Sequence, residues 1–236
     1  MNKKASQGFT LIEIAIVLVI IGLLLGGVLK GQELITSARV SNLISQQDGI
    51  KAAFFGFQDR YRALPGDYAA ASGNINCSGG CLNGDGNGQI LQAGTVTARE
   101  DLLVWTHLSA AGFINGAYVY AVADGGPLDK NSPKNPYSVF LSLWYDNTWG
   151  LVTNPKHNLK TGAQIPVEIL AEVDRKIDDG LPNGGSFQFS TYAPSGTGPA
   201  LTCTLTAAAA AVTTPAATDT WNVIGGITNC GAASLF

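Results

Sequence analysis

The stretch that decides the fold runs from Phe9 to Leu29, FTLIEIAIVLVIIGLLLGGVL, near the amino terminus. Its 21 residues include a single charged side chain, Glu13. An α-helix rises about 1.5 Å per residue, so this segment spans about 32 Å, enough to cross a hydrocarbon core of about 30 Å. We therefore predict a transmembrane helix over this stretch.

The residues before this segment set its orientation. Lys3 and Lys4 precede it without an acidic residue, so the positive-inside rule keeps the short leader in the cytoplasm and places the chain beyond Lys30 on the other side of the membrane. A cleaved signal peptide is the alternative, but the apolar run exceeds the usual length of about 7–15 residues, and no A-x-A-like site comes after it. A carboxylate is costly inside a membrane, which makes Glu13 a functional candidate.

The hexapeptide GFTLIE, Gly8 to Glu13, comes after a short basic leader and resembles the prepilin signature of type IV pilins and type II secretion pseudopilins. The resemblance implies that a prepilin peptidase cuts after Gly8 and N-methylates Phe9. It also implies that the helix is kept, first as a membrane anchor and then as the core of a filament. In that filament Glu13 would neutralise the amine of a neighbouring subunit. One departure is that no proline interrupts the chain between Met1 and Leu64, whereas many major pilins carry one midway along this helix.

The helical pattern continues beyond the membrane segment. Apolar residues recur at three- and four-residue steps as far as Tyr61, and Pro65 disfavours helix at Leu64. We interpret the aromatic stripe of Phe54, Phe57 and Tyr61 as core packing. The chain is thus predicted to comprise a leader at 1–8, one helix at 9–62 of roughly 80 Å with its transmembrane part at 9–29, and a globular head at 63–236.

The head is predicted to mix helices and strands. Helical spacing covers 99–112 and 167–177, and strand-like runs cover 118–122, 138–145, 149–152 and 187–192. The Ala/Thr-rich stretch 201–217 is interpreted as a variable surface loop. Four blocks resemble those of one group of prepilin-type proteins, namely LPGD at 64–67, NGDGNGQI at 83–90, WTHLSAAG at 105–112 and DRKIDDGLP at 174–182. The family implies an α+β fold in which the long helix packs on an antiparallel sheet of a loop-rich, disulfide-bonded head.

The four cysteines occur as a close pair, Cys77-x3-Cys81, and two more distant ones, Cys203 and Cys230. Outside the cytoplasm the economical pairing is Cys77–Cys81 and Cys203–Cys230, and the second bond would stabilise the head by roughly 3–4 kcal/mol. Zinc is the rival interpretation, but it needs four convergent ligands and only His107 and His157 could join the cysteines. The sequence therefore favours two disulfides.

A Gly/Asn-rich loop has the spacing of a calcium-binding loop. The candidate ligands are the side chains of Asn83, Asp85 and Asn87 and the main chain of Gln89. The usual glutamate at position 12 is replaced by Gly94, so Glu100 or Asp101 would have to fold back towards the ion. A flexible turn that binds no ion is the alternative.

A second acidic group is formed by Glu172, Asp174, Asp178 and Asp179. It could hold a cation, but Asp-Gly and Pro are turn chemistry, and a solvated helix end leading into a turn is favoured. The four tryptophans are interpreted as core packing rather than as a binding surface.

Composition narrows the class of function. Charged residues make up 13% of the 236 residues, about half the usual share of roughly 25%, which argues against a cytosolic enzyme with a densely charged surface. The 14 Lys and Arg form no basic run, so no nucleic-acid binding is evident. No G-x-S-x-G motif and no phosphate-cradling glycine loop with lysine occurs, and we predict that the protein is not an enzyme.

Together these observations predict a structural subunit, a minor or unusual pilin, of a type IV pilus-type filament. A type II secretion pseudopilin is the first alternative, and a membrane-tethered calcium-binding or adhesive module that does not polymerise is the second. The expected partners are the prepilin peptidase, copies of itself and other pilins, and an inner-membrane assembly platform. The precursor is expected in the bacterial inner membrane, and the assembled subunit in the periplasm or outside the cell. No cofactor is required, although calcium is possible.

Overall fold

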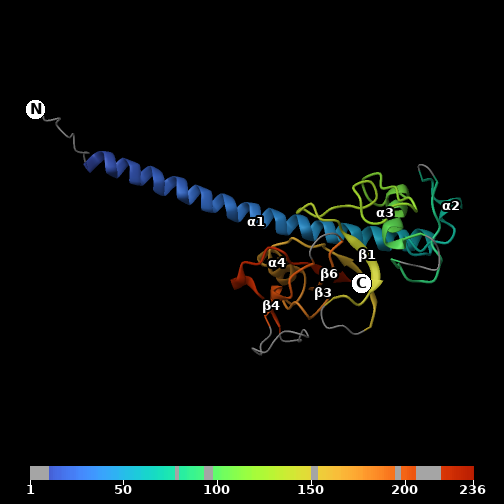
Figure 1. Cartoon of the computed structure of the whole chain (residues 1–236). Helices are drawn as coiled ribbons and strands as arrows, with labels where there is room; N and C mark the ends of the chain where they lie inside the picture. Colours follow the sequence, from blue (N-terminus) through green and yellow to red (C-terminus); the bar gives the residue numbers. More distant parts are fainter. Residues whose placement is uncertain (1–10, 78–79, 93–97, 150–153, 195–197, 206–218) are drawn as a thin grey trace, which may run out of the picture. The chain divides into compact units, whose positions relative to one another are not determined.

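The computed structural model describes residues 11–77, 80–92, 98–149, 154–194, 198–205 and 219–236 (Figure 1). The chain divides into two compact units between Arg39 and Val40. Helix α1, Leu11–Tyr61, contributes its first part to the first unit and its remainder to the second. The long helix expected of the sequence is therefore present, and each unit is described in turn.

The first unit is the apolar part of α1. Its length and composition are sufficient to cross a membrane, and none of its most apolar 18-residue window is buried. Val19 is 69% exposed and Leu23 is 75% exposed. The helix runs without interruption through Gly22, Gly26 and Gly27. An entirely apolar helix of this kind needs an apolar environment around its whole circumference.

The second unit contains the end of α1, three shorter helices and two sheets. The helices are α2 at Ala71–Asn74, α3 at Glu100–Ala110 and α4 at Val167–Ile177. An antiparallel four-stranded sheet has the order β1-β2-β6-β3, formed by Ser142–Asp146, Lys156–Lys160, Ala232–Leu235 and Phe187–Phe189. A separate pair joins β4 at Thr204–Leu205 to β5 at Thr220–Trp221, and two 3-10 turns lie at Leu201–Cys203 and Val223–Gly225.

The end of α1 supplies side chains to two hydrophobic cores. In one core, Val40 and Leu43 pack with α4, β3 and the Cys203–Cys230 disulfide. In the other, Phe54 and Phe57 pack with residues of α3, β1 and β2. The aromatic stripe thus serves core packing, as expected, with Tyr61 only partly buried at its end.

The two faces of the main sheet differ in chemistry because side chains alternate along each strand. Leu143 and Leu159, which are paired in register, belong to the core that contains the end of α1. The opposite face carries Trp144, Asn158 and Lys160, and part of it is covered by Trp149. A polar yet largely buried sheet face results.

In the head, α3 and α4 agree well with expectation and α2 was not predicted, whereas the strands agree only in part. Residues 118–122, predicted as a strand, are irregular because the N–H groups of Tyr118 and Tyr120 donate to the side chains of Ser109 and Thr106 instead of to a strand. The strand predicted at 138–145 begins only at residue 142, and that at 187–192 ends at residue 189. Strands β2, β4, β5 and β6 were not predicted.

Two predicted segments lie largely outside the described residues, namely 149–152 apart from Trp149, and 201–217 beyond residue 205. Residues 201–205 were predicted as surface loop but form a 3-10 turn and β4, because Cys203 is buried in a hydrophobic core. Both disulfides expected of the sequence are present, Cys77–Cys81 and Cys203–Cys230, with Cα atoms 5.1 and 5.9 Å apart. Trp105, Trp149 and Trp221 are buried, and Trp144 is partly buried.

Candidate functional sites

The first candidate site is the start of α1. Gly8 and Phe9, the predicted cleavage and methylation residues, lie outside the described residues. Glu13 lies in the first helical turn. There a carboxylate is close to backbone N–H groups that have no partner within the helix, and it interacts favourably with the helix dipole. This position suits a negative charge that must stay ionised in an apolar environment.

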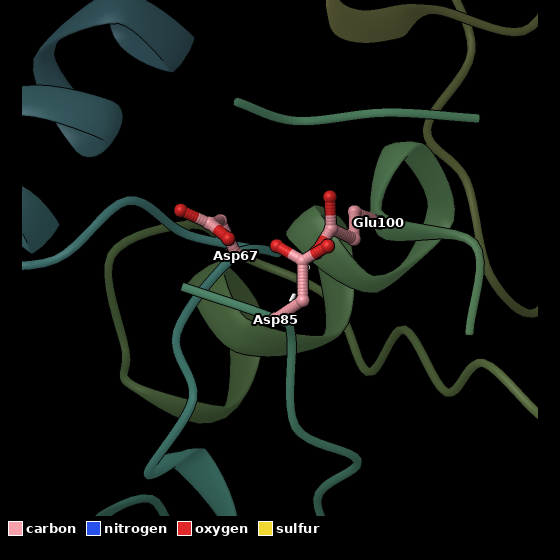
Figure 2. A group of neighbouring side chains, drawn as sticks. All are labelled: Asp67, Asp85 and Glu100. Carbon is pink, nitrogen blue, oxygen red and sulfur yellow. Dashed lines mark hydrogen bonds between the residues drawn. The ribbon is translucent and has the colours of Figure 1, made fainter. Parts of the chain in front are cut away.

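The second candidate site is a group of three carboxylates in the head, Asp67, Asp85 and Glu100 (Figure 2). They come from three separate parts of the chain: the turn after α1, the Gly/Asn-rich loop and the first residue of α3. One oxygen of each lies within 4.8 Å of the others. Asp67 and Glu100 are buried, and Asp85 is partly exposed.

Backbone geometry brings these carboxylates together. Gly66 adopts a φ of +89°, and a Cβ there would lie 2.6 Å from the carbonyl oxygen of Glu100, so the turn requires glycine. The Asp67 carboxylate accepts the N–H groups of Asn87 at 3.0 Å and Gly88 at 2.8 Å. Those two bonds join the turn after α1 to the Gly/Asn-rich loop.

The Glu100 carboxylate completes the arrangement. It accepts the N–H group of Asp85 at 3.0 Å through Oε1 and that of Leu91 at 3.1 Å through Oε2. Burial raises the pKa of Glu100 to about 7, and nearby Asp85 and Asp67 add a smaller increase. Burial also raises the pKa of Asp67. A divalent cation would relieve both effects, because it stabilises the charged form of each carboxylate.

Two of the predicted ligands, Asn83 and Asn87, form hydrogen bonds with the local backbone. Asn83 Oδ1 accepts the N–H group of Ser72 at 2.8 Å, and Asn87 Oδ1 accepts that of Gln89 at 2.8 Å, so both side chains support the local backbone. Of the two acids expected to fold back, Glu100 does so, while Asp101 forms an ion pair with Arg99 at 2.7 Å.

Asp67 was missed as a site residue. The available signal was its place in the LPGD block, directly after the glycine turn. Oxygen-rich groups of this kind suit calcium. Calcium binding at this site stays a prediction.

The second acidic group lies at the end of α4. One Asp178 oxygen accepts the N–H groups of Ser186 and Phe187, and Asp179 Oδ1 accepts that of Leu181. Asp174 accepts the indole N–H of Trp221 at 2.7 Å, and burial raises its pKa to about 7. Glu172 lies in ion pairs with Arg175 and Lys176 instead of joining the three aspartates. These bonds support the turn, yet one oxygen each of Asp174, Asp178 and Asp179 lies within 4.8 Å of the others, as in the first acidic group. Both the turn and the cation interpretation of this group therefore stay predictions.

The histidines considered for zinc have structural partners. His107 Nδ1 accepts the N–H group of Gly66 at 2.9 Å, and Nε2 lies 2.9 Å from the carbonyl oxygen of Leu82. Burial lowers the pKa of His107 to about 4, which favours its neutral form. Both ring nitrogens are thereby used, and the cysteines form disulfides.

The fold and the start of α1 define a class: a subunit with a long apolar amino-terminal helix and a disulfide-bonded α+β head. Comparison with known families agrees, because residues 3–29 match the prokaryotic N-terminal methylation motif. The chain therefore carries the prepilin-type signature of type IV pilins and pseudopilins, a structural class of proteins that prepilin peptidase processes. Neither a curated protein nor a solved structure matches the chain.

Proposed function

We propose that the protein is a structural subunit, a minor or unusual pilin, of a type IV pilus-type filament. In this proposal the precursor sits in the bacterial inner membrane with its leader in the cytoplasm and its head outside. Cleavage after Gly8 leaves N-methyl-Phe9 as the first residue. The mature subunit then moves from the membrane into a helical filament together with copies of itself and other pilins.

The observation that carries the proposal is the first part of α1. From Ile14 to Leu29 this segment has only apolar residues, and none of its most hydrophobic window is buried. A bilayer satisfies such a surface in the precursor, and neighbouring copies of the same helix can satisfy it in a filament. Because one surface suits both environments, the segment supports a subunit that is transferred from one to the other.

In this proposal Glu13 fixes the axial position of each subunit relative to its neighbour in the filament. Cleavage creates a charged amine at Phe9, and an amine and a carboxylate are each costly in an apolar environment unless they are paired. Glu13 lies in the first turn of α1, close in sequence to that new terminus. In the filament it would pair with the amine of a neighbouring subunit. Breaking a buried pair of this kind costs about 3–5 kcal/mol.

The test is a Glu13→Ala subunit in a strain that lacks the wild-type copy. We expect it to insert, to be cleaved to N-methyl-Phe9 and to form both disulfides, yet to give no filaments when the cell surface is sheared. Intact mass reports processing, and the sheared fraction reports assembly. Glu33→Ala is the matched control, because Glu33 is an exposed glutamate on the same helix and pairs with Lys30 at 2.7 Å. That control should assemble normally.

The outcomes separate the three candidate functions. Filaments from Glu13→Ala at wild-type yield contradict the pairing role. Wild-type protein that never enters a sheared fraction, together with a secretion defect in its absence, favours the type II secretion pseudopilin. A wild-type protein that stays in the membrane without such a defect favours the tethered calcium-binding or adhesive module.

A further inference from the structure

The face of the main sheet opposite Leu143 and Leu159 holds a buried lysine. The side chain of Lys160, on β2, is 1% exposed. Its Nζ lies 3.0 Å from Asp146 Oδ1 and 2.9 Å from Thr148 Oγ1. Taking an ammonium group out of water is costly even when it is paired, so a lysine at this position requires an explanation.

A buried asparagine lies beside this lysine. Asn158 precedes Lys160 by two residues on the same strand, so both side chains share one face. Asn158 Nδ2 donates to Asp146 Oδ1 at 2.8 Å and to the carbonyl oxygen of Lys156 at 3.0 Å. Among the described residues, Asn158 Oδ1 is buried without a hydrogen-bond partner.

One carboxylate oxygen therefore bridges an amine and a carboxamide. Asp146 Oδ1 accepts a hydrogen bond from Lys160 Nζ at 3.0 Å and another from Asn158 Nδ2 at 2.8 Å. The two nitrogens therefore lie on one shared acceptor. A proton can move between either nitrogen and this oxygen along an existing hydrogen bond. A carboxylate within hydrogen-bond distance of both the nucleophile and the leaving group can carry the protons of an acyl transfer.

The surroundings act on the charge of this amine in two directions. The faces of the Trp144 and Tyr192 rings, with centroids 5.7 and 5.5 Å from Lys160 Nζ, favour the charged ammonium. Burial lowers the pKa of Lys160 to about 8, although the nearby Asp146 charge opposes this shift. At pH 7 about a tenth of the side chains then carries a nucleophilic amine, against far less for a lysine in water.

We propose that Lys160 and Asn158 are joined by an intramolecular isopeptide bond, with Asp146 as the proton carrier. One proton passes from the Lys160 ammonium to the Asp146 carboxylate, and the neutral amine attacks Asn158 Cγ. The Cγ–Nζ bond forms as the Cγ–Nδ2 bond breaks. The leaving nitrogen takes a second proton from the original ammonium and departs as ammonia, which leaves Asp146 protonated.

The chemistry is favoured by position and by its product. Amide exchange with an amine is slow between separate molecules, but holding the two groups together replaces a bimolecular encounter with an intramolecular step. The product is a neutral amide in place of a buried ammonium ion. The reaction therefore removes the charge that makes this site costly. No oxidant, metal or second protein is required.

The test is the intact mass of the full-length wild-type protein, purified from membranes in detergent and then reduced and alkylated. We expect a mass lower by one ammonia than the sequence requires after leader processing. In the unfolded, reduced protein, trypsin should cleave after Lys156 but not after Lys160. Chymotryptic cleavage after Leu159 should leave the two halves joined, because the new bond bridges that position.

Variants then assign the bond. Lys160→Met should restore the full mass, and Asp146→Ala should reduce the extent of ammonia loss severalfold. Lys156→Arg, a change on the same face of the same strand, should keep the loss. Far-UV circular dichroism and intact disulfides confirm that each variant folds, and the wild-type mass decides the question even if a variant does not.

Several results would overturn the proposal. They are an unchanged wild-type mass, normal tryptic cleavage after Lys160, and a loss of water in place of ammonia, which would place the bond at Asp146. Ammonia loss that persists in Lys160→Met would show that the loss does not involve Lys160, as in a succinimide formed at an asparagine. Full ammonia loss in Asp146→Ala would contradict the role given to that carboxylate.

Discussion

The two parts of α1 share one helical backbone but differ in what surrounds them. Before Val40 the helix is apolar on all sides from Ile14 to Leu29 and polar in its last turns, and its large apolar side chains are exposed. From Val40 onward it has an apolar stripe that lies in the hydrophobic cores of the head, and a polar remainder. The first part therefore depends on partners outside the chain, whereas the second finds its partners within it.

The difference is visible in single side chains. Leu23 is 75% exposed, although Leu43 on the same helix is 1% exposed. Burying a leucine is worth about 1.5–3 kcal/mol, so a run of exposed leucines and isoleucines represents a large gain that only a membrane or other subunits can realise. Stability of the head and assembly of the filament should thus respond to different substitutions.

The largest effect is expected from removing residues 1–39, which deletes the first part of α1 and keeps the second. The described hydrophobic cores draw on residues from Val40 onward, so the shortened chain should fold without detergent and form both disulfides. It should not enter membranes or filaments. Sedimentation, circular dichroism and peptide mapping check this. A shortened chain that aggregates or lacks defined structure would show that the head depends on the first part of α1.

Within the second part of α1, Phe57→Ala and Phe55→Ala should differ sharply. Phe57 is fully buried, with its ring 4.6 Å from that of Tyr61 and stacked on His107 at 6.1 Å. Its loss should lower the free energy of unfolding by about 3–5 kcal/mol. Phe55 is 50% exposed, and its loss should cost about 1 kcal/mol or less. Denaturant titration of the chain that begins at Val40 measures both, and equal losses would contradict the burial pattern.

The sequence predicted the helices well because their apolar residues repeat at helical spacing over many residues. Strand β2 was missed because Lys156-His157-Asn158-Leu159-Lys160 is mostly polar, although Asn158 and Lys160 are buried. Strand β6 was missed because alanine and serine give little strand signal. The run at 118–122 looked like a strand but lies where side chains of α3 take its N–H groups.

The carboxylate group in the head shows a second limit of prediction from sequence, which is that residues far apart in the chain come together only in the fold. The loop around Asp85 was recognised from its spacing, and Glu100 was one of two acids expected to fold back. Asp67 comes from a turn well before the loop, and only the tertiary fold places it there. The choice between Glu100 and Asp101 depended on Arg99, which pairs with Asp101. Local spacing carries no information on either point.

The pH dependence of the head should report the buried carboxylate. Glu100 has a pKa raised to about 7 from an ordinary value of 4.5, so the folded state holds its proton more tightly than the unfolded state. Its contribution to stability is fully present below pH 4.5 and is lost as the pH rises through 7. Relative to Glu100→Gln, the wild type should lose about 2–3 kcal/mol of unfolding free energy between pH 5 and 8.

The comparison with Glu100→Gln removes two other contributions. His107, with its pKa lowered to about 4, destabilises the head as the pH falls below its ordinary value of 6.5, which opposes the effect of Glu100. Asp174 has a pKa raised to about 7 and acts in the same direction as Glu100. Both are unchanged in the variant, so the difference reports Glu100 together with its charge coupling to Asp67 and Asp85. A difference that does not vary with pH would show that Glu100 ionises normally.

The smallest expected effect is that of calcium on the head. A weak site with a Kd of about 10⁻⁴–10⁻³ M should stabilise the chain that begins at Val40 by about 1 kcal/mol at millimolar calcium. Asp85→Ala should abolish this gain because it removes one of the three carboxylates that lie within 4.8 Å of one another. Asp179→Ala is the matched control, since it removes an acid from the other acidic group, and it should keep the gain.

The ion competes with the proton on Glu100, so the gain in stability from calcium should be larger at pH 8 than at pH 6. A gain that survives Asp85→Ala but is lost in Asp179→Ala would move the ion to the loop after α4. Calcium binding would in either case change only the head, because its ligands all lie after Val40, and would leave the first part of α1 dependent on its membrane and filament partners.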